Sequence, residues 1–241
     1  MTSRQRADRL LVERGLFESR AQAQAAIAAG QVTADGQPVR KPSDALRSDA
    51  LLEAAPAHPW VSRGGVKLAA ALDSFGIDPS SRVCLDVGAS TGGFTDVLLA
   101  RGATRVYAVD VGRDQLHPRL RGDARVVSLE ATDIRTLAPL SPPPTLVTVD
   151  VSFISLRLVL PPALALAAKP AQLVALIKPQ FEAGRARLKK GIVQDDAIRR
   201  QVCDDISAVV ASLGWIVQGV VMSPIKGGDG NQEFLITAVH E

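Results

Sequence analysis

The sequence contains few residues of the kinds that build disulfide frameworks or metal centres. Its 241 residues include two cysteines and three histidines. Cys84 and Cys203 lie inside apolar segments, so we expect them to be reduced core residues of a cytoplasmic protein. His58, His117 and His240 are scattered along the chain without the spacing of metal ligands, and no metal site is expected.

The sequence also lacks a long uninterrupted apolar run. Its most apolar stretch, Leu156 to Ile177, is broken by Arg157, Lys169 and three prolines. Such a stretch is too polar to span a bilayer, and we expect a helix followed by a buried strand. The first residues do not form a positively charged lead into an apolar run, so no signal peptide is expected. These absences argue against a membrane protein.

The net charge of +3 is unevenly distributed along the chain. Residues 1–67 hold ten Lys/Arg against seven Asp/Glu, whereas the remainder holds eighteen of each. An excess of positive charge is expected in a domain that binds phosphate groups.

The first 56 residues have the pattern of a small α+β domain. Apolar spacing predicts helices over Ala7–Arg14 and Arg20–Ala29, the second with Ser19 as its N-cap, followed by short strands near Val32, Val39 and Leu51. The stretch A-A-P-A-H-P that follows is typical of a linker. We therefore predict a domain over 1–56, a linker over 57–63 and a second domain over 64–241.

The run R-A-D-R-L-L-V-E-R-G-L-F-E-S-R resembles the RNA-binding domain first seen in ribosomal protein S-four. In that family the second helix and its basic flank lie against RNA phosphates. The alternative is an ordinary solvated helix face. The candidate RNA-binding residues are Arg4, Arg6, Arg14, Ser19, Arg20 and Arg63.

Residues Val83 to Phe94, V-C-L-D-V-G-A-S-T-G-G-F, predict a strand, a glycine turn and a helix start. That arrangement places bare backbone at the carboxyl edge of a sheet, where α/β folds bind nucleotide-like ligands. The spacing is G-x-x-x-G-G, which is neither the dinucleotide fingerprint nor a P-loop. A dehydrogenase is therefore disfavoured, although a generic α/β turn remains an alternative.

Two carboxylates near this turn indicate which ligand it holds. Asp110 ends the next strand, 24 residues after Asp86, where an acid commonly binds ribose hydroxyls. Asp86 beside the loop favours a cationic ligand and disfavours a pyrophosphate. The combination predicts S-adenosylmethionine, which carries an adenosyl group and a sulfonium.

From Val83 onward, predicted strands and helices alternate. This pattern predicts a Rossmann-like, doubly wound α/β sheet, mostly parallel. The last two strands, 215–222 and 233–239, are joined by a loop without a helix, so we expect them to pair antiparallel.

Charged residues follow several of these strands. Asp150, Lys178 and Glu233 lie at predicted strand ends, and the crevice at that edge could bring them together with Lys67. Two lysines with two acids can hold one lysine beside a hydroxyl and lower the pKa of that hydroxyl. A structural ion-pair network is the alternative.

The order of V-S-R-G-G-x-K-L, L-D-V-G-A-S-T-G-G-F-T, V-D-V-S-F-I-S, I-K-P-Q-F-E and G-D-G-N-Q-E-F-L is similar to the TlyA family, often labelled hemolysins. Their catalytic domain resembles the FtsJ-type RNA 2′-O-methyltransferases. The resemblance implies a catalytic tetrad of Lys67, Asp150, Lys178 and Glu233. It implies that S-adenosylmethionine is held by Asp86, Gly88, Ser90, Thr91, Gly92, Gly93 and Phe94, with Asp110 on the ribose and Asp133 near the adenine.

Family substrates are cytidine 2′-hydroxyls of 16S and 23S ribosomal RNA, so the expected partners are ribosomal RNA and ribosomal subunits. A monomer is expected by default. Two alternatives are an RNA-binding protein without catalysis and a membrane-acting hemolysin. The second lacks support, since no predicted helix joins a basic face to a large aromatic one.

Overall fold

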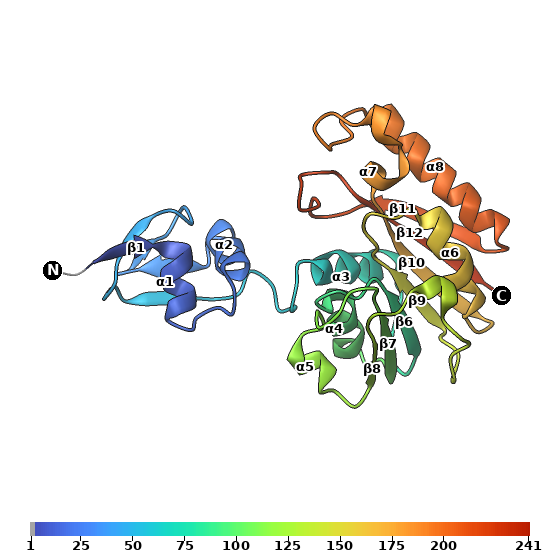
Figure 1. The fold of residues 1–241 in the computed structure, drawn as a ribbon, viewed down its shortest axis with the longest axis horizontal. Coiled ribbons are helices and arrows are strands. Elements are labelled where there is room, and N and C mark those ends of the chain that lie inside the picture. Colours follow the sequence, from blue (N-terminus) through green and yellow to red (C-terminus); the bar gives the residue numbers. More distant parts are fainter. Residues whose placement is uncertain (1–2) are drawn as a thin grey trace. The chain divides into compact units, whose positions relative to one another are not determined.

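The computed structural model describes residues 3–241, which form two compact units that divide between Pro59 and Trp60 (Figure 1). The N-terminal unit packs two helices against two small antiparallel sheets around a core that includes Leu11 and Ile27. Its helices are α1 (Ala7–Glu13) and α2 (Arg20–Ala28). Its strands are β1 (Arg4–Arg6) paired with β4 (Ala45–Arg47), and β3 (Gln37–Pro38), β2 (Val32–Ala34) and β5 (Leu52–Ala54) in the second sheet. Strands β1 and β4 were not predicted, because three residues are too few to show an alternating pattern.

The second unit is built on one seven-stranded sheet. Five adjacent strands, from β10 to the edge strand β8, are parallel, and β12 lies antiparallel between β10 and β11. In spatial order the strands are β11 (Ile216–Met222), β12 (Phe234–His240), β10 (Ala171–Ile177), β9 (Leu146–Val149), β6 (Val83–Val87), β7 (Arg105–Val109) and β8 (Val126–Leu129). The predicted fold class and the antiparallel last strand are confirmed.

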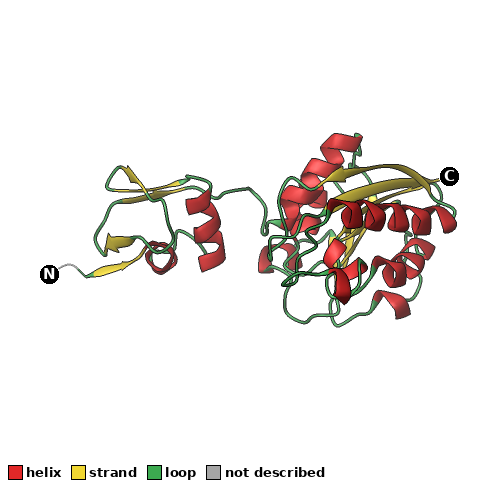
Figure 2. Ribbon diagram, turned by 90° about the horizontal axis from the view of Figure 1, so that it is seen from above, coloured by secondary structure: helices red, strands yellow, loops and turns green. Residues whose placement is uncertain are grey.

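Helices cover both faces of this sheet (Figure 2). One apolar cluster joins the sheet to α3 (Gly64–Phe75), α4 (Gly93–Ala100) and the short α5 (Pro118–Arg121). The other joins it to α6 (Leu156–Ala165) and α8 (Asp196–Ser212). The short helix α7 (Pro179–Glu182) follows β10, and 3-10 turns lie at Ile134–Thr136 and Arg185–Arg187.

The strand order reverses between β6 and β9. From β6 the chain proceeds outward to β7 and β8, then crosses to β9 on the other side of β6. The carboxyl ends of both strands lie at the same edge of the sheet, so the loops that follow them diverge and leave a crevice. The predicted glycine turn and Asp150 both lie at this point.

The boundary between the units falls at Pro59 and Trp60, inside the predicted linker of 57–63. Residues 60–63 pack within the second unit. The backbone N–H of Val61 donates to Asp96 at 2.9 Å, and a Cβ on Gly65 would lie 2.4 Å from the Trp60 side chain. The apolar Trp60 and Val61 account for the difference, because they pack against the cluster that holds α3 and α4.

Candidate active site

The glycine turn after β6 is shaped by close approach to the β9 loop. Gly88 has φ +83°, and a Cβ there would lie 2.3 Å from the carbonyl oxygen of Asp150. Gly93, at the first position of α4, would similarly meet Ser62 Oγ at 2.2 Å. Gly88 requires glycine for both conformation and space, and Gly93 requires it for space alone.

Asp110, at the end of β7, holds the same turn from the other side. Its carboxylate accepts hydrogen bonds from the backbone N–H of Ser90 at 2.8 Å and of Gly112 at 2.7 Å. Ser90 has φ +47°, so this bond secures an unfavourable backbone conformation. Asp110 therefore fixes the turn as well as facing the cavity described next.

A cavity of about 540 Å³ opens beside these elements. That volume is in the range of small-molecule sites. Among the predicted cofactor residues, Gly88, Ser90, Asp110 and Asp133 line it, together with Asp150 of the predicted tetrad. Asp133 accepts from the backbone N–H of Arg135 at 2.9 Å, and the Arg135 side chain lowers its pKa. The cavity wall is mostly apolar, and these carboxylates are separate hydrogen-bond acceptors on it.

Asp86 lies beneath the turn and lines neither this cavity nor the one described below. It is fully buried, and its carboxylate accepts from Thr95 Oγ1 at 2.7 Å and from Thr148 Oγ1 at 3.2 Å. Burial raises the pKa of Asp86 to about 7, against the lowering effect of the Thr95 hydroxyl. The position predicted for direct cofactor contact is therefore a buried acid that braces β6, β9 and α4.

The four residues of the predicted tetrad form two ion pairs. Lys178 Nζ lies 2.6 Å from Asp150 Oδ1, and Lys67 Nζ lies 2.5 Å from Glu233 Oε2. Glu233 is 2% exposed, and both lysines are 8% exposed. A buried charge without a partner would be costly, so the pairing explains how four charges remain inside the fold.

These pairs come from four separate segments of the chain. Lys67 lies in the first turn of α3, Asp150 follows β9, Lys178 follows β10, and Glu233 precedes β12. Gly227 allows the loop before β12 to close on the site, because a Cβ there would lie 2.4 Å from Glu233 Oε1.

A second cavity, of about 290 Å³, lies at these charges. Lys67, Asp150 and Lys178 line it, together with Arg63 and the glycine turn. The turn contributes Gly88, Ala89, Ser90, Thr91, Gly93 and Phe94. Gly92 does not line this cavity. It has φ +98°, and a Cβ there would lie against Leu116 and Leu120.

The two cavities share part of their walls. Gly88, Ser90, Asp150 and Ser152 line both. A ligand in the larger cavity and a ligand in the charged cavity would thus adjoin each other across these residues.

Sequence reasoning did not single out Ser152 or Ser62. Ser152 Oγ accepts from Lys178 Nζ at 2.7 Å, and Ser62 lines the charged cavity. Serine is common in every loop, so the only available signal was the position of Ser152 two residues after Asp150.

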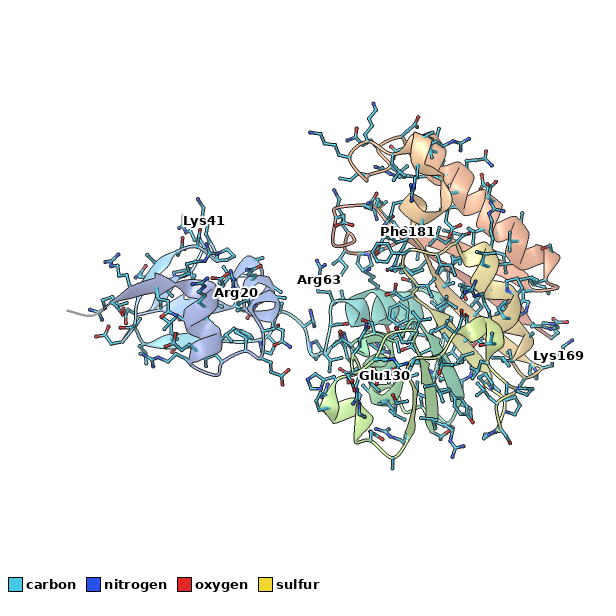
Figure 3. All side chains as sticks on the ribbon, in the orientation of Figure 1. Arg20, Lys41, Arg63, Glu130, Lys169 and Phe181 are labelled. Carbon is cyan, nitrogen blue, oxygen red and sulfur yellow. The ribbon has the colours of Figure 1, made fainter. Side chains whose placement is uncertain are left out.

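Two of the predicted RNA contacts of the N-terminal unit, Arg6 and Arg20, are held by one buried acid. The Asp8 carboxylate, fully buried, accepts from Arg6 at 3.0 Å and from Arg20 at 2.7 Å. The Arg6 guanidinium holds the pKa of Asp8 well below its usual value, and Arg20 lowers it further. Both arginines keep about half of their side-chain surface exposed. Figure 3 labels Arg20 and Lys41 on this unit.

The other predicted RNA contacts have different local roles. Arg4 is exposed on β1, and Arg14 donates to the backbone carbonyl of Ser48. Ser19 caps α2 by accepting from the backbone N–H of Gln22 at 3.3 Å. Arg63 is exposed beside the charged cavity of the second unit.

The sheet, the glycine turn at its switch point and the paired cavities define a Rossmann-like methyltransferase that uses S-adenosylmethionine. The FtsJ-like methyltransferase family matches residues 60–239, and the S4 domain matches residues 5–52. The chain belongs to the TlyA family, whose catalytic domain is FtsJ-like and whose N-terminal domain is S4. The predicted family and cofactor class are therefore confirmed.

Three relatives illustrate the similarity. The 16S/23S rRNA (cytidine-2′-O)-methyltransferase TlyA of Mycobacterium tuberculosis strain H37Rv is 45% identical, over 98% of this chain and 90% of its own. Hemolysin A of Brachyspira hyodysenteriae is 40% identical, over 95% of this chain and 98% of its own. A solved structure described as a hemolysin from Streptococcus thermophilus superposes with a TM-score of 0.78 at 41% identity, covering all of this chain and 90% of that one.

Residues 3–241 contain no helix that is both long and apolar enough to cross a membrane. In the same part of the chain, no group of three potential ligands is arranged to hold a metal ion.

Proposed function

We propose that the protein transfers a methyl group from S-adenosylmethionine to a cytidine ribose 2′-hydroxyl in 16S or 23S ribosomal RNA. The observation that carries the proposal is a cavity lined by Lys67, Lys178 and Asp150, with Glu233 paired to Lys67, that shares a wall with the glycine-turn cavity. The identity of 45% to a relative with this activity supports the choice of substrate.

The larger cavity fits the cofactor. Gly88 lets the turn pack closely against the β9 loop at the cavity wall, and Asp110 faces the cavity as an acceptor for ribose hydroxyls. Asp133 provides an acceptor on the same wall, suited to the adenine amino group. When bound, S-adenosylmethionine supplies an electrophilic methyl on a sulfonium that departs as a neutral thioether.

The tetrad acts on the hydroxyl of the substrate. Lys178 donates a hydrogen bond to the 2′-oxygen and stabilises the charge that develops as the O–H proton leaves. Asp150 keeps Lys178 in place through the ion pair at 2.6 Å. Lys67, held by Glu233, steadies the nucleotide in the charged cavity. In the balanced reaction a C–O bond forms, a C–S bond breaks, and the hydroxyl proton passes to solvent.

Much of the rate comes from alignment. The sulfonium is already a good leaving group, so holding the oxygen in line with the methyl removes a large entropic part of the barrier. We further infer that the protein acts as a monomer in the cytoplasm, because all four tetrad residues come from one chain and ribosomal RNA is its substrate.

The direct test combines the purified protein, labelled S-adenosylmethionine and ribosomal RNA lacking 2′-O-methyl groups. We expect label in the RNA, and mapping should place it on a cytidine 2′-oxygen. RNA binding without label transfer would favour a binding protein. Label on a base atom would contradict the ribose assignment.

A further inference from the structure

The boundary between the two cavities is where the methyl donor and the hydroxyl must meet, and Ser152 lies on it. It is one of only four described residues that line both cavities. The others are two residues of the glycine turn and Asp150. Ser152 follows β9 and is exposed at this boundary.

Ser152 also contacts the lysine that acts on the hydroxyl. Lys178 Nζ donates to Ser152 Oγ at 2.7 Å and lies 2.6 Å from Asp150 Oδ1. An ammonium group has three N–H donors. In the part of the chain that the structure describes, Ser152 Oγ is the hydrogen-bond acceptor of Lys178 and Asp150 its ion-pair partner, so the ammonium keeps N–H donors for a ligand.

Two contacts at separate positions restrict the orientation of the Lys178 ammonium. A lysine side chain has four rotatable bonds, and an ion pair with one carboxylate leaves the ammonium free to turn about that contact. The second contact, from Ser152, removes this freedom. Lys178 lines the charged cavity, so an N–H that Ser152 does not engage is available to a ligand there.

We propose that Ser152 is a positioning residue for methyl transfer: its hydroxyl orients the Lys178 ammonium so that one N–H meets the ribose 2′-oxygen. The inference rests on the proposed function and deepens it. Ser152 does not exchange a proton with the substrate; it acts through Lys178.

The test compares Ser152→Ala with Ser152→Thr in the full-length protein, using methyl transfer to ribosomal RNA under steady-state conditions. Because Ser152 is exposed, its alanine variant should fold normally. Losing a hydrogen bond to a charged group costs about 1.5–3 kcal/mol, so we expect kcat to fall roughly 10- to 100-fold in Ser152→Ala. KM for RNA and Kd for S-adenosylmethionine should stay within about two-fold, since the hydroxyl is engaged with Lys178. Ser152→Thr retains the hydroxyl and should recover most of the wild-type kcat.

Ser155→Ala is the matched control. Ser155 lies in the same loop, but its hydroxyl donates to Glu182 at 2.6 Å and caps α6, and it lines neither cavity. We expect a lower Tm with unchanged kcat, because loss of a helix cap affects stability.

The outcomes separate this inference from the proposed function. If the wild-type protein does not methylate ribosomal RNA, the proposed function fails and this inference fails with it. If the wild type is active and Ser152→Ala retains kcat within two-fold, only the role of Ser152 is overturned. Equal losses in the alanine and threonine variants, or a loss confined to KM, would also overturn it.

Discussion

The two units both bury charge, but the N-terminal unit exposes one partner of its ion pairs whereas the catalytic tetrad encloses both. In the N-terminal unit the acid is hidden: Asp8 has no exposed side-chain surface, whereas Arg6 and Arg20 keep 44% and 48% of theirs. In the catalytic unit both members of each pair are mostly enclosed, and the lysine side chains are only 10% exposed. In the N-terminal unit a buried acid holds exposed arginines, which present positive charge to RNA phosphates. In the catalytic unit the lysine–acid pairs are enclosed, so their charges act on a group bound in the cavity.

The difference follows from the physics of the two tasks. Phosphate contacts are made at the surface and are screened by salt, so several guanidinium groups must be held outward. A transition-state contact gains strength where water is excluded. The following experiments test whether the two arrangements serve these separate purposes.

The largest effect should come from Lys178→Ala. Removing the ammonium that stabilises the developing charge should reduce kcat at least 10³-fold, on the order of general acid–base and electrostatic contributions. Affinity for S-adenosylmethionine, measured by calorimetry, should change by only a few-fold, because Lys178 does not line the larger cavity.

Lys169→Ala is the control for that variant. Lys169 precedes β10 whereas Lys178 follows it, so the strand separates them by about 20 Å. Lys169, labelled in Figure 3, is exposed. We expect normal turnover from Lys169→Ala; normal turnover from Lys178→Ala would remove the lysine from the mechanism.

Gly88→Ala should strongly weaken cofactor binding. The added Cβ would lie 2.3 Å from the Asp150 carbonyl oxygen, so the turn or the β9 loop must shift. We expect the Kd for S-adenosylmethionine to rise at least 100-fold, which corresponds to about 3 kcal/mol.

Gly214→Ala isolates the conformational part of that effect. Gly214 has the same φ of +83°, but a Cβ there would meet nothing within 4 Å. This variant should lose some stability through backbone strain and bind the cofactor normally. Similar Kd values for the two variants would show that the close approach at Gly88 does not shape the site.

Asp8→Asn tests the hidden acid of the N-terminal unit. Arg6 and Arg20 would lose the negative charge that they share, and we expect the N-terminal unit to lose about 1–3 kcal/mol of unfolding free energy. RNA affinity should also fall several-fold, because the arginines are no longer held in place. Asp49→Asn, which removes an exposed partner of Arg47, is the control and should change stability by less than about 1 kcal/mol. RNA binding that is unaffected by Asp8→Asn would contradict the anchoring role.

Asp86→Asn should change the pH dependence of stability of the catalytic unit. The folded-state pKa of about 7 lies above the unfolded value, so the acid favours folding in its neutral form and this contribution is lost as pH rises from about 4 to 7. The asparagine variant should therefore gain stability relative to wild type over this range, by at most about 4 kcal/mol at neutral pH. Denaturant unfolding at several pH values measures the difference.

Asp123→Asn should change the pH dependence of stability in the opposite direction. Its hydrogen bond from Arg125 lowers the pKa of Asp123 to about 2, so the stability it provides is present above the unfolded pKa and lost as pH falls toward 2. The difference in unfolding free energy between this variant and wild type should be constant between pH 5 and 7. If the difference in unfolding free energy between Asp86→Asn and wild type is also constant over this range, Asp86 does not titrate between pH 5 and 7.

Much of the fold could be predicted from local patterns. Val83–Val87 and the glycine turn were predicted from apolar spacing and small residues, and α2 from its Ser19 cap, because these signals are contained in a few consecutive residues. The insertion of β12 between β10 and β11 was not predicted, since strand pairing depends on long-range contacts. The burial of Asp86 was missed for the same reason: the hydroxyls that satisfy it come from β9 and α4.

By itself, the sequence determined the two-domain order, the alternation that builds a parallel sheet, and which charged residues follow its strands. Only the tertiary structure decided how those charges pair, that Lys178 meets both Asp150 and Ser152, and that Asp86 is enclosed beneath the turn. Residue types and short-range periodicity are local properties of the chain. Pairing and burial arise only when distant segments pack at one edge of the sheet and exclude water.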